Sequence, residues 1–241
     1  MFHPKGPTFL ELAQQALSST DRGYDLIARK FDYTPFRTPD AILEQVAREI
    51  GPEGSVARGL DLCCGTGAGL RWIRPLCREV VVGLDRSEGM LEEARRRLAD
   101  APGSAPIELV RGDALEPPLA TRFDLVTCFG AFGHILEADE PRLVDRIATL
   151  LVPGGRFVFV TGRMPPIWSP QLWLARGFNA AMHVRNALVS PPFVMYYLTF
   201  LLPSCQELLE SRGFDVEVRS DVFPEPFRRV ELVLATLRSR S

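Results

Sequence analysis

Residues 60–69, Leu-Asp-Leu-Cys-Cys-Gly-Thr-Gly-Ala-Gly, constrain the fold more than any other stretch of this 241-residue chain. Apolar residues precede the glycines and residues 70–73 resume with helical spacing, which predicts a buried strand, a tight turn and a helix start. Gly65, Gly67 and Gly69 permit left-handed backbone and the close approach of a ligand. The unpaired N–H groups of a helix start favour a nucleotide-like ligand with an anionic group.

Strands and helices alternate along the middle of the chain. Short apolar runs separated by amphipathic segments are typical of a parallel sheet that is covered by helices on both faces, a doubly wound α/β fold. Ser87 is the predicted N-cap of the helix that follows the second strand. The predicted strands span 58–62, 80–84, 107–110, 123–128, 156–160, 214–218 and 230–236, and N-terminal helices precede them.

Composition narrows the class of protein. With 46% hydrophobic and 24% charged residues and a net charge of −2, the chain is typical of a globular protein without a general attraction to nucleic acid. The five cysteines form no C-x-x-C pair, and no Cys/His cluster has the spacing of metal ligands, so no metal is expected. Reduced thiols and the lack of an evident signal peptide or spanning segment predict a cytoplasmic protein.

Two cofactor classes compete for the glycine-rich turn. A dinucleotide site needs G-x-G-x-x-G, but Leu70 stands where the third glycine would be. Asp61, four residues before Gly65, is not part of the dinucleotide pattern. The arrangement resembles motif I of class I, Rossmann-like, S-adenosylmethionine (SAM) dependent methyltransferases of the small-molecule type. That resemblance implies SAM as cofactor, S-adenosylhomocysteine as product, and a three-layer α/β/α sandwich whose seven-stranded sheet is mostly parallel, with the last strand antiparallel.

The resemblance also implies roles for acidic residues at the strand ends. Asp85 lies 20 residues after Gly65, where a carboxylate accepts both ribose hydroxyls. Asp113 occupies the position that bonds the adenine amino group, and Ala114 would offer its N–H to the ring. The full predicted cofactor set is Tyr33, Asp61, Cys63, Gly65, Gly67, Asp85, Arg86, Met90, Asp113, Ala114, Cys128 and Phe129.

The stretch after the fourth strand, residues 128–134, is the acceptor region by the same resemblance. It lacks the Asp/Asn-Pro-Pro-aromatic sequence of enzymes that methylate DNA amines, which favours a small, largely apolar acceptor. Because a hydroxyl acceptor must lose a proton, His134 is the candidate general base, although a packing role fits the sequence too. His183 is the second candidate.

Residues 163–202 interrupt the alternation with aromatic and methionine side chains and three arginines but no acid. They predict a helical insertion that covers the acceptor pocket, and its arginines favour an anionic group on the acceptor. Two other interpretations stay open: a core or dimer interface, and weak contact with a membrane surface. The predicted acceptor-binding residues are Phe132, Trp168, Trp173, His183, Tyr196 and Tyr197.

The predicted organisation has four parts: a helical cap at 1–52, the SAM-binding core at 53–162, the lid insertion at 163–202, and a helix with a strand pair at 203–241. The predicted function is in-line methyl transfer from SAM to a small hydrophobic, anionic or neutral acceptor, with oxygen favoured. A SAM-binding protein without transfer activity and an NAD(P)-dependent oxidoreductase are the alternatives. The sequence does not distinguish a monomer from a homodimer.

Overall fold

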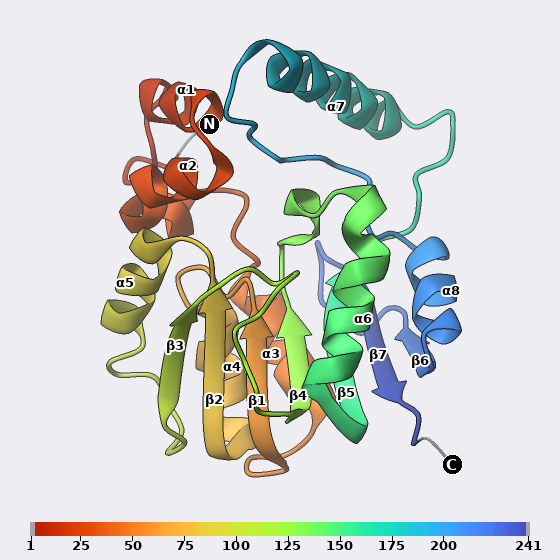
Figure 1. Cartoon of the computed structure of the whole chain (residues 1–241). Helices are drawn as coiled ribbons and strands as arrows, with labels where there is room; N and C mark the ends of the chain where they lie inside the picture. Colours follow the sequence, from red (N-terminus) through yellow and green to blue (C-terminus); the bar gives the residue numbers. More distant parts are fainter. Residues whose placement is uncertain (1–2, 240–241) are drawn as a thin grey trace.

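Seven strands form one sheet in the order β3-β2-β1-β4-β5-β7-β6, as Figure 1 shows for the computed structural model, which describes residues 3–239. Only β7 runs antiparallel to its neighbours β5 and β6. The mostly parallel seven-stranded sheet is therefore confirmed. The strands are β1 (Val56–Leu62), β2 (Cys77–Asp85), β3 (Ile107–Arg111), β4 (Phe123–Cys128), β5 (Leu151–Thr161), β6 (Phe214–Arg219) and β7 (Glu231–Leu237).

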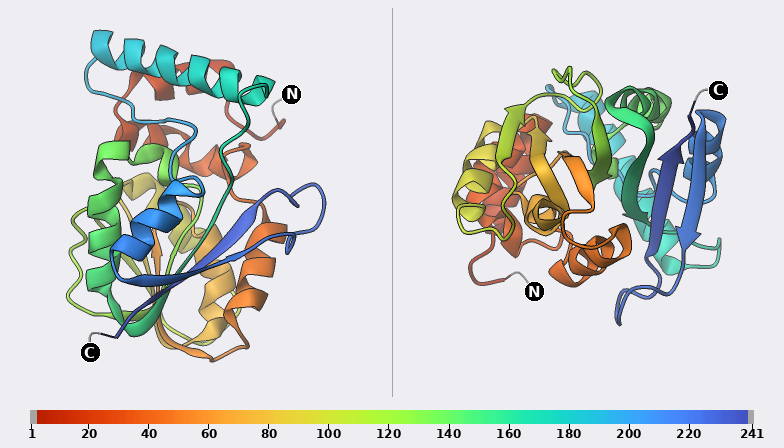
Figure 2. Two further views of the ribbon diagram at one scale, coloured as in Figure 1. Left: turned by 90° about the vertical axis from the view of Figure 1, so that its right-hand side faces the viewer. Right: turned by 90° about the horizontal axis from the view of Figure 1, so that it is seen from below.

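Helices cover both faces of the sheet, and each face has its own apolar core. On one face α6 and α8 pack against β1, β4 and β5, and on the other α3, α4 and α5 pack against β1, β2 and β7. This is the predicted three-layer sandwich (Figure 2). The helices of these layers are α3 (Asp40–Ile50), α4 (Ala68–Ile73), α5 (Glu88–Arg97), α6 (Glu140–Leu150) and α8 (Ser204–Ser211), with short 3-10 turns η2 (Arg74–Leu76), η3 (Phe132–His134) and η4 (Glu137–Asp139).

A separate group of helices lies beyond the carboxyl ends of the strands (Figures 1 and 2). We call residues 3–33 and 163–202 the cap. It contains α1 (Phe9–Leu17), α2 (Thr20–Ile27), η1 (Ala28–Tyr33) and α7 (Pro170–Leu188). Although α3 falls inside the predicted 1–52 segment, it packs on the sheet through Ile42 and Val46 and is not part of the cap.

The cap is attached to the core at the start of α5. The Oδ1 atom of Asp25 on α2 accepts hydrogen bonds from the Ser87 hydroxyl (2.5 Å) and the Gly89 N–H (2.9 Å). Ser87 also caps α5, as predicted, by accepting from the Met90 N–H. A negative charge at a helix N-terminus is favourable, so this contact stabilises both α5 and the docking of the cap.

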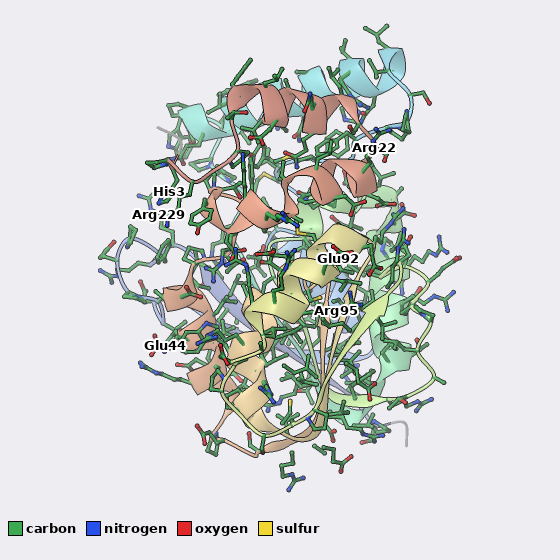
Figure 3. All side chains as sticks on the ribbon, turned by 90° about the vertical axis from the view of Figure 1, so that its left-hand side faces the viewer. His3, Arg22, Glu44, Glu92, Arg95 and Arg229 are labelled. Carbon is green, nitrogen blue, oxygen red and sulfur yellow. The ribbon has the colours of Figure 1, made fainter. Side chains whose placement is uncertain are left out.

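The outer face of α5 is mostly solvated. Figure 3 shows Glu92 and Arg95 projecting away from the sheet, and both are exposed. Glu93 differs, because it is buried and its carboxylate pairs with Arg97, which also reaches Asp32 of η1 at 2.9 Å. The pair therefore joins α5 to the cap and is not a solvated surface group.

Candidate functional site

A cleft of about 870 Å³ separates the cap from the carboxyl ends of β1, β2 and β4. This position, beyond the strand ends of a doubly wound sheet, is where such folds bind ligands. The walls come from the glycine-rich turn, from residues 85–90, from residues 129–134 and from the cap. A second depression continues under the cap, lined by residues 195–199 and part of the same 130–134 loop.

Asp85, the last residue of β2, is held in one orientation by two backbone amides. One carboxylate oxygen accepts from the Gly65 N–H at 2.8 Å and the other from the Ser87 N–H at 2.9 Å. Burial raises the pKa of this carboxyl, and the two backbone hydrogen bonds oppose that rise. Each oxygen keeps a lone pair, so the group can still accept two hydroxyl hydrogens from a ligand.

Asp61, near the end of β1, lies directly below the glycine-rich turn and is 2% exposed. The Thr127 hydroxyl donates to its Oδ1 atom at 2.7 Å, while a Cβ placed on Gly69 would come within 2.5 Å of Oδ2. The glycine therefore allows helix α4 to approach the carboxylate. Burial raises the pKa of Asp61 to about 7, and the charge of Asp85 adds to that rise.

These two carboxylates decide which kind of ligand fits the turn. A dinucleotide would bring a pyrophosphate dianion to Asp61 and Asp85, and like charges at close range in a buried site are costly. A cation would instead offset the cost of burying both carboxylates. The site therefore fits SAM, which carries a sulfonium and an ammonium group, and it does not fit the anionic group that the helix start suggested.

Cys63 is the residue of the turn whose backbone is strained. Its φ is +55°, in the left-handed region that side chains other than glycine rarely adopt. The side chain lines the cleft next to Cys128, and contact with the Cys63 thiol, together with burial, raises the pKa of Cys128 well above its usual value. All five cysteines are free thiols.

We expect Cys63→Gly to be more stable than Cys63→Ala by about 1 kcal/mol, because both variants lose the sulfur but only glycine tolerates the left-handed backbone. Urea denaturation of the two variants side by side measures the difference. Equal stability, or a more stable alanine variant, would show that the turn can relax away from the left-handed conformation.

Tyr24 and His134 form a hydrogen-bonded pair at the cleft wall. The Tyr24 Oη atom lies 2.6 Å from His134 Nε2, and His134 Nδ1 lies 2.6 Å from the Val194 carbonyl oxygen. Because a carbonyl only accepts, we assign the imidazole proton to Nδ1, so Nε2 accepts from the Tyr24 hydroxyl. Burial lowers the pKa of His134 and raises that of Tyr24, so both groups are neutral near pH 7.

The predicted cofactor residues fall into two groups. Seven of them line the cleft, as does the predicted base His134: Asp61, Cys63, Gly65, Asp85, Arg86, Met90 and Phe129. Gly67, Ala114 and Cys128 lie beside it without lining it, and Asp113 pairs with Arg86 at 3.4 Å. Tyr33 stacks on His3 outside the cleft (ring centroids 4.8 Å apart), because the η1 turn directs Phe31 inward in its place.

The predicted acceptor residues are more dispersed. Phe132, Tyr196 and Tyr197 line the second depression. His183 stacks on Tyr196 but lines neither cavity, and Trp168 and Trp173 are 81% and 59% exposed on the outer face of the cap. The structure thus brings half of this set to the site.

The arginines of the insertion do not reach either cavity. Arg163 pairs with Glu231 at 2.7 Å, and Arg185 donates to the carbonyl oxygens of Ser18 and Pro191. Arg176 lies over the Trp173 ring at 5.2 Å. The expectation that these arginines hold an anionic group of the acceptor is therefore not supported by their positions.

Among the cleft residues that the sequence prediction missed are Tyr24, Phe31 and Arg37. The two aromatic residues lie in the predicted helical cap at 1–52, but no sequence pattern distinguished their rings from that of Tyr33. No sequence pattern indicated that Arg37 would line the cleft. Its guanidinium pairs with Asp32 and Asp40, and its Nε atom is buried without a hydrogen-bond partner.

Two features are absent from the part of the chain that the structure describes. Within residues 3–239 no group of three or more His, Cys, Asp or Glu side chains is arranged to hold a metal ion. In the same part of the chain, every helix is too short or too polar to span a membrane.

Comparison with known proteins agrees with the geometry. Residues 60–155 match the family described as "Methyltransferase domain". A demethylmenaquinone methyltransferase of Symbiobacterium thermophilum is 38% identical over 111 residues, which are 44% of this chain and 43% of that protein. A dTDP-3-amino-3,6-dideoxy-alpha-D-glucopyranose N,N-dimethyltransferase of Streptomyces fradiae is 36% identical over 114 residues, 46% of this chain and 40% of that protein. The matches thus span less than half of either relative.

The fold comparison covers more of the chain. An O-methyltransferase family protein of Burkholderia thailandensis superposes with a TM-score of 0.71 at 16% identity, over 97% of this chain and 69% of that one. The likeness extends the shared fold beyond the matched domain. Residues 60–155 are thus similar to a methyltransferase domain, and the chain as a whole has the fold of an O-methyltransferase family protein.

Proposed function

We propose that this protein transfers a methyl group from SAM to a hydroxyl of a small, largely apolar acceptor. The observation that carries the proposal is the pair of carboxylates, buried Asp61 and partly buried Asp85, at a glycine-rich turn that opens into an apolar cleft. When bound, SAM supplies an electrophilic methyl group on a sulfonium, so the protein has to align the reactants and exclude water.

The cofactor-binding roles follow from the geometry of the cleft. Asp85, fixed by two amides, accepts the ribose hydroxyls, and Asp61 faces the cationic amino-acid part. Arg37 lines the cleft, and its buried Nε makes no hydrogen bond although it lies 3.4 Å from an Asp32 carboxylate oxygen, so Arg37 is the group we assign to the carboxylate of SAM. We assign Asp113 to the adenine amino group, which requires that Arg86 leave its ion pair with that carboxylate.

The acceptor site is the part of the cleft between Tyr24, Phe129 and His134, together with the second depression under the cap. Aromatic and aliphatic walls there favour a flat, apolar molecule. Methylation of a quinone-like ring or of a sugar is the activity named for the relatives above, and the apolar walls favour the former class for this chain.

Tyr24 and His134 handle the acceptor's proton in this proposal. Because the Tyr24 hydroxyl hydrogen points to His134 Nε2, the tyrosine oxygen offers its lone pairs to the cleft. As the acceptor oxygen forms its new bond to carbon, its proton passes to the Tyr24 oxygen and the Tyr24 proton passes to Nε2. Tyr24 thus touches the acceptor, and His134 receives the proton through it.

The test is transfer of labelled methyl from SAM to a panel of naphthols, hydroquinones and amino sugars. We expect product with the aromatic hydroxyl compounds, and we expect Tyr24→Phe and His134→Gln each to lower kcat by about 100-fold, the usual worth of a general base. SAM affinity measured in parallel should stay within a few-fold of the wild type. Binding of SAM without transfer to any class of acceptor would favour a non-catalytic SAM-binding protein, and an unchanged kcat would remove the pair from catalysis.

A further inference from the structure

We propose that the outer face of the cap docks on an anionic lipid surface, from which a lipophilic acceptor enters the cleft. The entry of an acceptor from lipid rests on the function proposed above, whereas the docking itself does not. Four observations carry it: exposed apolar side chains, their helical register, the local charge, and the position of the cap over the cleft.

Exposed apolar side chains concentrate in the cap. Among the described residues, the large apolar side chains with substantial exposure lie in two segments, 9–26 and 164–197, with Leu136 as the one exception. Such clustering is unusual for a surface that faces only water. The most exposed are Trp168 (81%), Phe9 (79%), Leu188 (79%), Leu174 (78%), Ile167 (72%) and Leu10 (68%).

Helix α7 has its apolar face outward. Trp173, Leu174, Val184 and Leu188 follow the three- and four-residue spacing of one helix face, and small residues (Gly177, Ala180 and Ala181) fill the positions between them. A helix that only covered a pocket would turn this stripe inward and a polar stripe toward water. In the structure this stripe faces outward, while the buried side chains of the helix, Leu172 and Met182, lie on its other face.

The apolar faces of α1 and α7 form one surface. Both helices lie at the end of the molecule farthest from the amino ends of the strands, in Figure 1 and in the left-hand view of Figure 2. The Arg185 side chain near the end of α7 donates to the Ser18 carbonyl oxygen at the end of α1, at 2.9 Å. Val194, after α7, donates its N–H to Thr20 Oγ1. These contacts join the two segments edge to edge.

The net charge of the cap indicates which kind of partner this surface binds. Residues 3–33, with Asp32 included, and 163–202 hold seven basic and four acidic residues, a net +3, whereas the whole chain carries −2, so the remainder carries −5. Two of these cations are paired, Lys30 with Glu11 and Arg163 with Glu231. The exposed cations without a salt bridge among the described residues are Lys5, Arg22, Arg29 and Arg176. A positive, apolar face complements anionic lipid, and two such faces in a homodimer would repel each other.

Tryptophan and arginine occur together at the edge of this surface. The guanidinium of Arg176 lies 5.2 Å from the centre of the Trp173 ring, and Arg22 lies on α2 at the same end of the molecule (Figure 3). Indole rings and basic side chains on an amphipathic helix are typical of binding in the lipid headgroup region. The cleft and the second depression lie directly beneath the cap, so an apolar acceptor would reach them from lipid by a short path.

Vesicle sedimentation of the full chain tests the proposal. We expect binding to phosphatidylcholine vesicles that contain phosphatidylglycerol, a blue shift of tryptophan emission on binding, and weaker binding to pure phosphatidylcholine. Arg176→Gln should weaken binding by about fivefold, the worth of one basic residue at an anionic surface. The double variant Leu174→Ser/Leu188→Ser should weaken it by at least about tenfold.

Matched controls lie outside the cap. Leu136→Ser removes an exposed apolar side chain elsewhere, and Arg122→Gln removes an exposed cation at the start of β4, so both should bind vesicles like the wild type. Wild-type protein that stays in solution with both vesicle types would overturn the docking proposal, as would self-association in the ultracentrifuge that the Leu174/Leu188 variant abolishes. Titration of the same samples with SAM tests the proposed function separately. The docking proposal and the proposed function can therefore fail independently.

Discussion

Replacing Asp61 by asparagine is expected to stabilise the unliganded protein above pH 7 and, at the same time, to weaken SAM binding by about tenfold or more. The folded-state pKa of Asp61 is raised from 3.8 to about 7 by burial. A raised pKa means that the stability contribution of the neutral carboxyl is present below pH 4 and is lost as the pH rises to 7. Asparagine keeps the acceptor for Thr127 and does not ionise.

The expected gain is about 2–4 kcal/mol at pH 8 and close to zero at pH 4, since about three pKa units correspond to about 4 kcal/mol at most. Thermal or urea denaturation of wild type and Asp61→Asn across this pH range measures it. Calorimetry in two buffers adds a second readout, because the cofactor's positive charge should lower the Asp61 pKa and release a proton on binding near pH 6. A pH-independent difference in stability would show that Asp61 is ionised with an ordinary pKa.

Replacing Asp85 by asparagine should reduce SAM affinity by about 10- to 100-fold with little loss of stability. The amide cannot accept from both Gly65 and Ser87, so one amide hydrogen bond and one charged contact to the ligand are lost together. Asp124→Asn is the matched control, because that carboxylate also accepts from a backbone amide, of Arg58, but at the opposite end of the sheet.

Calorimetric titration with SAM and with S-adenosylhomocysteine measures both variants. We expect the Asp124 variant to bind like the wild type. If Asp85→Asn bound with wild-type affinity, the ribose role of Asp85 would be wrong, and the cofactor would have to lie elsewhere in the cleft.

The local sequence was sufficient to predict most of the strands and the segments that connect them. The apolar runs that end at Leu62, Asp85 and Cys128 are strands because each segment is apolar on both faces, which only a covered parallel sheet satisfies. Ser87 was predictable as a cap for the same local reason, since its hydroxyl bonds a backbone N–H three residues ahead. Such features depend on neighbours along the chain.

The side-chain orientations in the cap could not be predicted in this way, because the sequence does not show which side of each cap segment faces the cleft and which faces outward. Tyr24 and Tyr33 both precede motif I, yet only the α2–η1 geometry turns Tyr24 toward His134 and Tyr33 toward His3. Trp168 and Trp173 are residue types typical of a pocket wall, but Trp173 lies on the exposed side of α7 and Trp168 is exposed in the segment before it. Contacts between distant segments, such as Tyr196 N–H to Gly133 O at 2.8 Å, decide these orientations.

The central claim is that Asp61, Asp85 and the glycine-rich turn form a site for SAM, and calorimetric titration of the full chain tests it most directly. We predict saturable binding of SAM and of S-adenosylhomocysteine at one site per chain, competing with each other and accompanied by a rise in melting temperature. Neither heat nor a thermal shift with either compound, at concentrations well above those that saturate comparable sites, would contradict the account.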